Sequence, residues 1–374
     1  MSAAPRASDR ARAGIAGPGG ATPEPGAPTP APGRPARAVV AITAALALVG
    51  AILLAAHPWH GRAALPPPVG DRPIPTGTAS GPYRAFSPTS YWNTPLPADA
   101  PIAPDSAAVV SFIERDNQVG HLVLTGAGPK GRWGHPIYWA EPGDPTYRVG
   151  NDCSFSTPAA FSAVRIPLGA RPDPGSDADM TVYDIGRGLV YGFWKARYDV
   201  GSNSWSACGG TAYSLSSNGL DGGLAQSDDS ANAGHRGLPP PVYAVRFDEI
   251  KAGVIDHVLR INVNTTGCSH VFPMTGDECG THAPAAPPEG ARVRLDPSID
   301  LAGLHLSPGA LVIARALQRY GAVIGDQTGG AATIQLEDVV AEGRGWLWKG
   351  VLGPDALRKL PLGDLQVIAP GFGS

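Results

Sequence analysis

The stretch GHRGLPPPVYAVRFDEIKAGVIDHVLRINVN, from Gly234 to Asn264, decides the fold class. A Gly/Pro-rich loop leads into an apolar run at residues 242–247, which predicts a strand. A tight connection at residues 248–253 follows, and residues 254–264 predict a second strand because apolar and polar side chains alternate there. His257 is in phase with the apolar residues. We therefore expect it either buried and satisfied by a neighbour, or placed where the apolar face opens into a groove.

Short strands separated by turns are predicted on both sides of this stretch. The expected strands cover residues 121–125, 180–183, 189–198, 205–217 and 292–298. Residues 322–326 and 331–337, with a QTGG turn between them, predict a hairpin. Such a series of short strands is typical of sandwich folds.

Two helices interrupt the predicted strands. Residues 106–115 follow Asp105, an expected N-cap, and place apolar side chains on one face. Residues 308–320 follow Ser307 as cap and end before Gly321. The large number of short strands compared with helices predicts a mainly β, single domain of β-sandwich or jelly-roll type with two or three short helices.

The amino-terminal part of the chain differs in composition from the rest. Residues 1–37 are Ala, Pro, Gly and Arg with few large apolar side chains, which predicts a disordered tail. Residues 38–56 are uncharged and apolar and predict one transmembrane helix. Residues 57–82 are rich in Pro and Gly and predict a linker, so the globular domain is expected at residues 83–374.

Charge predicts how this anchor is oriented. Residues 1–37 carry five arginines and two acidic residues, a net +3, so the remainder carries −6 because the whole chain carries −3. The positive-inside tendency predicts a single-pass membrane protein with a cytoplasmic amino terminus and an extracellular carboxy-terminal domain. A cleaved signal peptide is the alternative, although the leader is long and no A-x-A site follows. The net negative charge of the chain after residue 37 excludes an overall positive electrostatic field that would attract nucleic acid.

The four cysteines all follow the apolar segment. They lack a C-x-x-C pair, and outside the cytoplasm an even set predicts two disulfides. Of the three possible pairings we expect Cys268–Cys279 with Cys153–Cys208, because the first pair closes a short local loop.

Several common functional sites are missing from the sequence. The chain has no G-x-S-x-G, H-E-x-x-H, P-loop or EF-hand motif, and its nine histidines lack metal-ligand spacing. GAGPKG at residues 126–131 has the glycine spacing of a dinucleotide-binding turn, but Pro129 lies inside it and Arg132-Trp133-Gly134 follows where a helix should begin. We therefore expect neither a metal nor a cofactor.

The candidate site consists of polar residues that lie in or next to the predicted apolar segments. Glycoside hydrolysis needs two carboxyl groups, and Glu249 with Asp326 or Asp184 is the expected pair. Elimination from a uronate would instead use a base such as His257 or Tyr320. The expected substrate-binding residues, aromatic or cationic, are Trp194, His235, Arg236, Arg260, Arg294 and Tyr320.

The same residues also have structural interpretations. Asp248 and Glu249 are suited to capping the connection before Gly253. Arg260 and Arg294 have acidic neighbours, Asp256 and Asp296, with which they would pair at the surface. Tyr320 would be a core residue at a helix end, and Asp326 a turn residue.

Eight sequence landmarks resemble a family of exported, mostly actinobacterial proteins with no assigned reaction. They are SYWNTPLP (90–97), DADMTVYD (177–184), YGFWKA (191–196), AGHRGLP (233–239), RFDEI (246–250), IDHVLRI (255–261), PPEGARVRLDPS (287–298) and RALQRYGAVIGD (315–326). The family pattern often has histidine at the position of Asp179 and glutamate at that of Gly192. The resemblance implies a glycan-processing or wall-associated β-sandwich.

Together these features predict a membrane-anchored extracellular protein that acts on a glycan, as a glycoside hydrolase. The alternative is a non-catalytic carbohydrate-binding or cell-wall-associated structural module, and the second alternative is a polysaccharide lyase. Two carboxyl groups roughly 5–10 Å apart in a cleft would favour the hydrolase.

Overall fold

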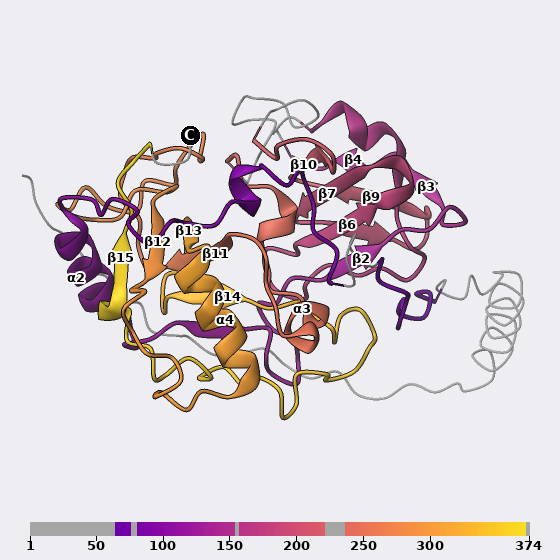
Figure 1. Ribbon diagram of the computed structural model, residues 1–374. Helices are drawn as coiled ribbons and strands as arrows, with labels where there is room; N and C mark the ends of the chain where they lie inside the picture. The colour runs from indigo at the N-terminus through magenta and orange to yellow at the C-terminus, as the bar shows by residue number, and fades with distance from the viewer. Residues whose placement is uncertain (1–63, 76–80, 154–156, 221–235, 372–374) are drawn as a thin grey trace, which may run out of the picture. The chain divides into compact units, whose positions relative to one another are not determined.

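The computed structural model describes residues 64–75, 81–153, 157–220 and 236–371 (Figure 1). Residues 61–374 form one compact unit. The expected tail at residues 1–37, the apolar segment at residues 38–56 and His235 lie outside the described residues. Within the described ranges no helix has the length and apolar character needed to cross a membrane.

The mainly β class is confirmed, with several sheets and three α-helices in the described part of the chain. The largest sheet has six strands in the order β1-β14-β11-β13-β12-β15. Their bounds are β1 Val123–Thr125, β14 Thr333–Gln335, β11 Leu259–Val263, β13 Ala322–Gln327, β12 Arg292–Leu295 and β15 Leu365–Val367. The sheet is mixed, because the pairs β1–β14 and β11–β13 are parallel. A jelly-roll arrangement is not confirmed.

A second sheet of four strands has the order β10-β7-β6-β2. Its strands are β10 Gly209–Ser214, β7 Leu189–Trp194, β6 Met180–Asp184 and β2 Ile137–Trp139. The pairs β10–β7 and β6–β7 are antiparallel, whereas β2 runs parallel to β6. Two small sheets complete the strands: β3 (Thr146–Tyr147) with β5 (Val164–Arg165), and β4 (Gly150–Asn151) with β9 (Ser204–Ala207) and β8 (Arg197–Asp199).

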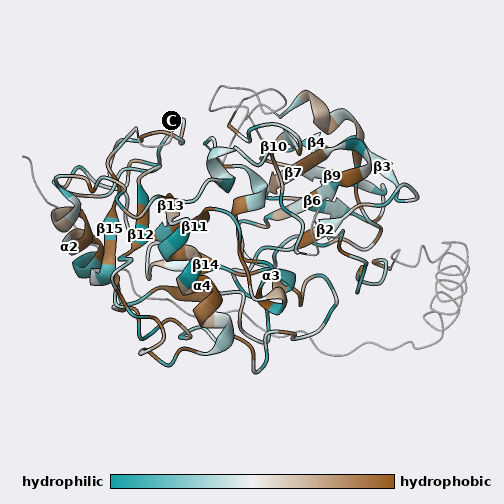
Figure 2. Cartoon of the chain, viewed as in Figure 1, coloured by the Kyte–Doolittle hydropathy of each residue, from teal (hydrophilic) through white to brown (hydrophobic). Residues whose placement is uncertain are grey.

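Three apolar layers hold these elements together. The helices α2 (Ser106–Asp116) and α4 (Pro308–Arg319) bury their apolar stripes against the six-stranded sheet, and Figure 2 shows hydrophobic colour on parts of both helices. A middle layer joins the two large sheets through residues such as Val323 from one sheet and Tyr183 and Val190 from the other, together with Val258, which precedes β11. The third layer lies between the four-stranded sheet and the small sheets.

The expected strand at residues 242–247 is wrong. Residues Pro240–Val242 form a 3-10 turn, and Phe247–Ala252 form helix α3 where a simple connection was expected. Consecutive prolines fix φ and remove backbone donors, so they favour a turn over a paired strand. The Glu249 side chain then accepts the backbone N–H of Arg246 at 2.9 Å, which caps the helix.

The second expected strand is shorter than the range, residues 254–264, that its alternating pattern predicts. β11 covers only Leu259–Val263, and every one of its residues is buried. Leu259, Ile261 and Val263 belong to the helix-covered layer, so the alternate residues Arg260 and Asn262 face the other side of the sheet.

The expected hairpin at residues 322–337 is also wrong. β13 and β14 do not pair with each other, because both pair with β11, which lies between them. The predicted helix before β13 is confirmed as α4, with the Ser307 hydroxyl accepting from the backbone N–H of Ala310. The crossover through α4 allows β13 to return parallel to β11, which a tight turn cannot do.

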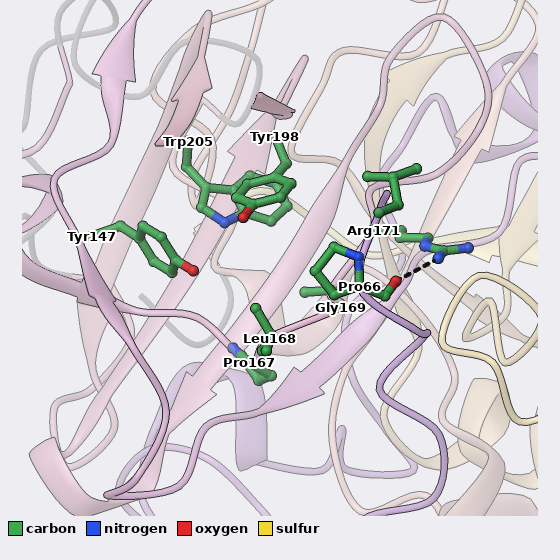
Figure 3. A pocket seen from close by; sticks show the side chains of 10 residues that line it. Pro66, Tyr147, Pro167, Leu168, Gly169, Arg171, Tyr198 and Trp205 are labelled. Carbon is green, nitrogen blue, oxygen red and sulfur yellow. Dashed lines mark hydrogen bonds between the residues drawn. The ribbon is translucent and has the colours of Figure 1, made fainter. Parts of the chain in front are cut away.

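Residues 64–75, expected to be linker, pack on the domain as a strap. Gly70 N–H donates to the Glu342 carbonyl at 2.8 Å, and the Arg72 guanidinium makes a bidentate pair with Asp144 at 2.6 and 2.9 Å. Arg171 donates to the carbonyl of Pro66 at 3.0 Å (Figure 3). The compact unit therefore includes residues before Tyr83.

Both expected disulfides, Cys153–Cys208 and Cys268–Cys279, are confirmed.

Candidate functional site

Glu249 and His257, expected in the catalytic set, form a buried hydrogen-bonded pair. His257 Nε2 lies 2.8 Å from Glu249 Oε1, and Arg246 lies 3.2 Å from the same oxygen. Burial opposes the charge of Glu249, but Arg246 and His257 outweigh it and lower the pKa of Glu249 below its ordinary value. This arrangement fixes α3 to the residues that precede β11, which is the structural interpretation of both side chains.

Asp184 is fully buried and bound to backbone and arginine. Its carboxylate accepts from Arg165 at 2.9 Å and from the backbone N–H of Arg187 at 3.1 Å. The carboxylate thereby caps the 3-10 turn at Ile185–Arg187. These contacts hold the turn between β6 and β7 and join it to Arg165 of β5.

Three of the expected substrate-binding side chains have intramolecular contacts. The Lys195 ammonium lies over the Trp194 ring at 4.5 Å. Arg294 donates to Gln366 at 3.0 Å and to the Pro97 carbonyl at 3.2 Å, so its expected surface pairing with Asp296 is not what holds it. Tyr320 is 2% exposed, which agrees with the core interpretation.

Asp326 lies at an irregularity of the central parallel pair. Ile261 pairs with Ile324 but Asn262 pairs with Asp326, so Gly325 is an extra residue in β13. A β-carbon added to Gly325 would lie 2.8 Å from Cδ of Arg260. Glycine therefore allows the arginine stem to cross the bulge. Bulges redirect the side chains next to them, and they are frequent beside functional sites.

Asp326 has the chemistry of a proton donor near neutral pH. Burial, together with the adjacent Glu278 carboxyl, raises the pKa of Asp326 to about 7, although Arg260 and Arg236 oppose the change. The hydrogen bond between Asp326 and Glu278 favours the protonated form of Asp326. The Glu278 side chain is 31% exposed, so this pair reaches solvent.

Asp179 provides a second carboxyl group in the same region. Burial raises the pKa of Asp179 well above its ordinary value, and the negative charge of Asp326 adds to this rise while Arg260 opposes it. Its Oδ1 atom is buried and finds no hydrogen-bond partner among the described residues. A buried carboxyl oxygen of this kind is available to a ligand or a water molecule.

Arginine and tyrosine side chains define the floor of this cluster. The Arg260 guanidinium lies 4.9 Å from the ring centre of Tyr243 and donates to the side-chain oxygen of Gln335. Arg236 binds Glu289 at 3.1 Å and also binds Glu278. Glu278 is thus held by Arg236 on one side and by the Cys268–Cys279 disulfide, one residue away, on the other.

The structure brings together only part of the expected site. Asp326, Arg236 and Arg260 meet, whereas Glu249, His257, Asp184, Trp194, Arg294 and Tyr320 make their described contacts elsewhere. Sequence reasoning missed Asp179 and Glu278 as site residues. A single sequence carries no signal that these two residues meet Asp326, because all three are far apart along the chain.

One group of metal-ligand side chains occurs in the described ranges, and it lies outside this cluster. Cys268, Cys279 and His282 are close together, but the two sulfurs are bonded to each other. Thiolate is the form of cysteine that binds metal, so the disulfide form of this group does not make a metal centre.

Comparison of the chain with protein-family models, with curated proteins and with solved structures gave no match. The interpretation of the site therefore depends on its own geometry and charge.

Proposed function

We propose that the protein hydrolyses a glycan and that Asp326 is the general acid. The observation that carries the proposal is the Asp326 carboxyl group, which keeps a proton near neutral pH beside two further carboxyl groups. Glycoside hydrolysis uses this combination of one protonated and one ionised carboxyl group.

The proposed reaction follows from these groups. Asp326 donates its proton to the glycosidic oxygen as the bond from that oxygen to the anomeric carbon breaks. A water molecule adds its oxygen to the anomeric carbon, and its proton passes to the Glu278 carboxylate, which Arg236 binds. The Asp326 acid and the Glu278 carboxylate thus provide both an acid and a base. The Arg260 guanidinium stabilises the ionised form.

The cellular location is part of the proposal. The apolar segment at residues 38–56 would anchor the chain in the cell membrane, with the domain outside the cytoplasm as a β-sandwich facing environmental or cell-wall glycans. The two disulfides support an oxidising compartment.

A digestion of a glycan panel tests the activity. Full-length protein in mild detergent would be incubated with neutral, amino-bearing and uronate-containing oligosaccharides, and the products would be read by mass spectrometry. We expect products that have gained water, and a loss of at least about a hundredfold in rate for Asp326→Asn. The matched control is Asp105→Asn, because Asp105 is exposed and its side chain caps no backbone group.

Other products would change the conclusion. Unsaturated products would assign a lyase, and tight binding without any product would assign a carbohydrate-binding module. Equal rates for Asp326→Asn and wild-type protein would reject Asp326 as the acid.

A further inference from the structure

Trp133 is an exposed aromatic side chain in an unfavourable backbone conformation. Its side chain is 42% exposed and its φ is +60°. A bulky residue rarely adopts this left-handed conformation, and such outliers are concentrated at ligand sites. The residue follows the Gly-rich loop at residues 126–131, for which the dinucleotide interpretation was rejected.

Two side chains hold the Trp133 backbone in this conformation. Its N–H donates to the Asp173 carboxylate, and its carbonyl accepts from the Gln335 amide at 3.3 Å. The ring stands beside Gly175, where an added β-carbon would lie 3.1 Å from it. The surrounding chain therefore fixes the direction of the ring without burying it.

The same two partners connect Trp133 to the Asp326 cluster. Gln335 accepts from Arg260, whose charge acts on both Asp326 and Asp179. Asp173 donates its backbone N–H to the carbonyl of Asp179 at 2.9 Å. The Trp133 backbone is thus connected to the Asp326 cluster through Asp173, which binds the backbone of Asp179, and through Gln335 of β14, which binds Arg260.

We infer that Trp133 is the stacking platform of a subsite for an uncharged sugar ring. The identity of the ligand as a glycan rests on the proposed function. A fixed, exposed indole offers a large apolar face at little entropic cost, as aromatic anchors in binding sites do. Asp173, which binds the Trp133 backbone, has Asp177 and Arg132 as charged neighbours, and Asp177 also acts on Asp179. Acidic groups outnumber Arg132 in this region, which disfavours uronates and other anionic sugars.

Calorimetric titration of the full-length protein tests the subsite. The probes are cellotetraose and tetra-N-acetylchitotetraose as neutral glycans and tetragalacturonate as an anionic one, with wild-type and Asp326→Asn proteins in parallel. We expect a neutral probe to bind and Trp133→Ala to weaken its affinity by about tenfold or more. Trp133→Phe should retain most of the affinity. Leu168→Ala, which removes an apolar side chain that is 52% exposed, should leave it unchanged.

Trp133→Gly separates binding from stability. Glycine adopts positive φ without steric cost, so this variant should melt at the wild-type temperature or above it while binding is lost. A clearly lower melting temperature would show that the ring is structural and would overturn the inference. Neutral binding that is unchanged in Trp133→Ala, or binding of tetragalacturonate alone, would also overturn it.

The outcome for the subsite is distinguishable from that for the reaction. Loss of neutral binding in Trp133→Ala, with no cleavage by the wild-type protein, would keep the subsite and reject the hydrolase. Cleavage by the wild-type protein with unchanged affinity in Trp133→Ala would reject the subsite alone.

Discussion

Glu249 and Asp326 both lie near arginines, and their pKa values nevertheless shift in opposite directions. Glu249 is in direct contact with Arg246 and His257 and accepts a backbone N–H, so its charged form is stabilised. Asp326 also accepts a backbone N–H, from Gln327 at 2.9 Å, but burial and the neighbouring Glu278 carboxyl group destabilise its charged form. Direct contact with a cation, rather than the number of arginines nearby, decides the sign.

This contrast predicts that Asp326→Asn stabilises the fold in alkaline solution. The folded-state pKa of Asp326 is raised, so its contribution to stability is present below the unfolded pKa and is lost as pH rises to about 7. The asparagine side chain of the variant does not ionise, so the variant does not lose this stability as pH rises. At about pH 8 we expect the free energy of unfolding of the variant to be about 2 kcal/mol higher than that of the wild type, after allowance for solvent screening. Urea unfolding at several pH values measures the difference.

Glu249→Gln provides the opposite case for the same experiment. The folded-state pKa of Glu249 is lowered, so its contribution is present above the unfolded pKa and is lost as pH falls through the folded value. Removing it leaves Arg246 and His257 without their shared carboxylate. At neutral pH we expect a loss of about 3 kcal/mol or more, decreasing in acid. If both variants changed stability in the same direction at about pH 8, the charge assignment would be wrong.

At the scale of elements, local signals predicted α4 well and α3 poorly. Ser307, Pro308 and Gly321 mark the ends of α4 in the sequence, and the structure begins and ends the helix next to them. α3 has six residues, too few for an amphipathic pattern, and its cap depends on a buried glutamate. The pairing of β13 and β14 with β11 was not predictable, because a nearby turn in the sequence indicates only which strands are consecutive.

The bulge in β13 gives a prediction for Gly325→Ala. The added methyl group would meet Cδ1 of Leu238 and the buried stem of Arg260, both closer than 3.0 Å. We expect a loss of about 1–3 kcal/mol in the free energy of unfolding, because the core has no room to expand. Displacement of Arg260 should also raise the pKa of Asp326 further, which 13C NMR of labelled aspartate side chains would detect.

Gly353→Ala is the control for this prediction. An added β-carbon at Gly353 would have no neighbour within 4 Å, and the residue has ordinary φ, so its stability should match that of the wild type. Equal stability of both variants would show that β13 adjusts freely at the bulge.

At the scale of the whole molecule, composition predicted the class of fold and the disulfides but not the layers. Alternating patterns indicated which residues are buried, yet β11 is buried on both faces: its apolar residues face the helix-covered layer, and Arg260 and Asn262 are buried on the other face. The candidate site lies on the face of β11 that carries Arg260 and Asn262. Its carboxyl groups come from residues 179, 278 and 326, which are far apart in the sequence. Single-sequence patterns do not report such contacts.

The Cys268–Cys279 disulfide gives a prediction for stability and for the site together. Closing a loop of about a dozen residues restricts the unfolded chain and contributes on the order of 3 kcal/mol. The double variant Cys268→Ser/Cys279→Ser should therefore melt at a lower temperature than wild type in oxidising buffer, and reductant should remove the difference. Because Glu278 adjoins Cys279, the pKa of Asp326 should fall toward its ordinary value in the variant.

Cys153→Ser/Cys208→Ser is the matched control. This pair closes a longer loop, with a sequence separation of 55, so the loss of stability should be at least as large. The pKa of Asp326 should not change. A fall in that pKa in both double variants would show a global effect rather than the release of Glu278.

The strap at residues 64–75 determines how a pulling force would enter the domain. Tension applied upstream of Ala64 would reach the bond between Arg171 and Pro66 first, then that between Gly70 and Glu342, and then the pair between Arg72 and Asp144. These attachments join three separate parts of the chain, around residues 144, 171 and 342. A tethered molecule would therefore lose the strap first, one attachment after another, and the sheets would carry load only after the strap had detached.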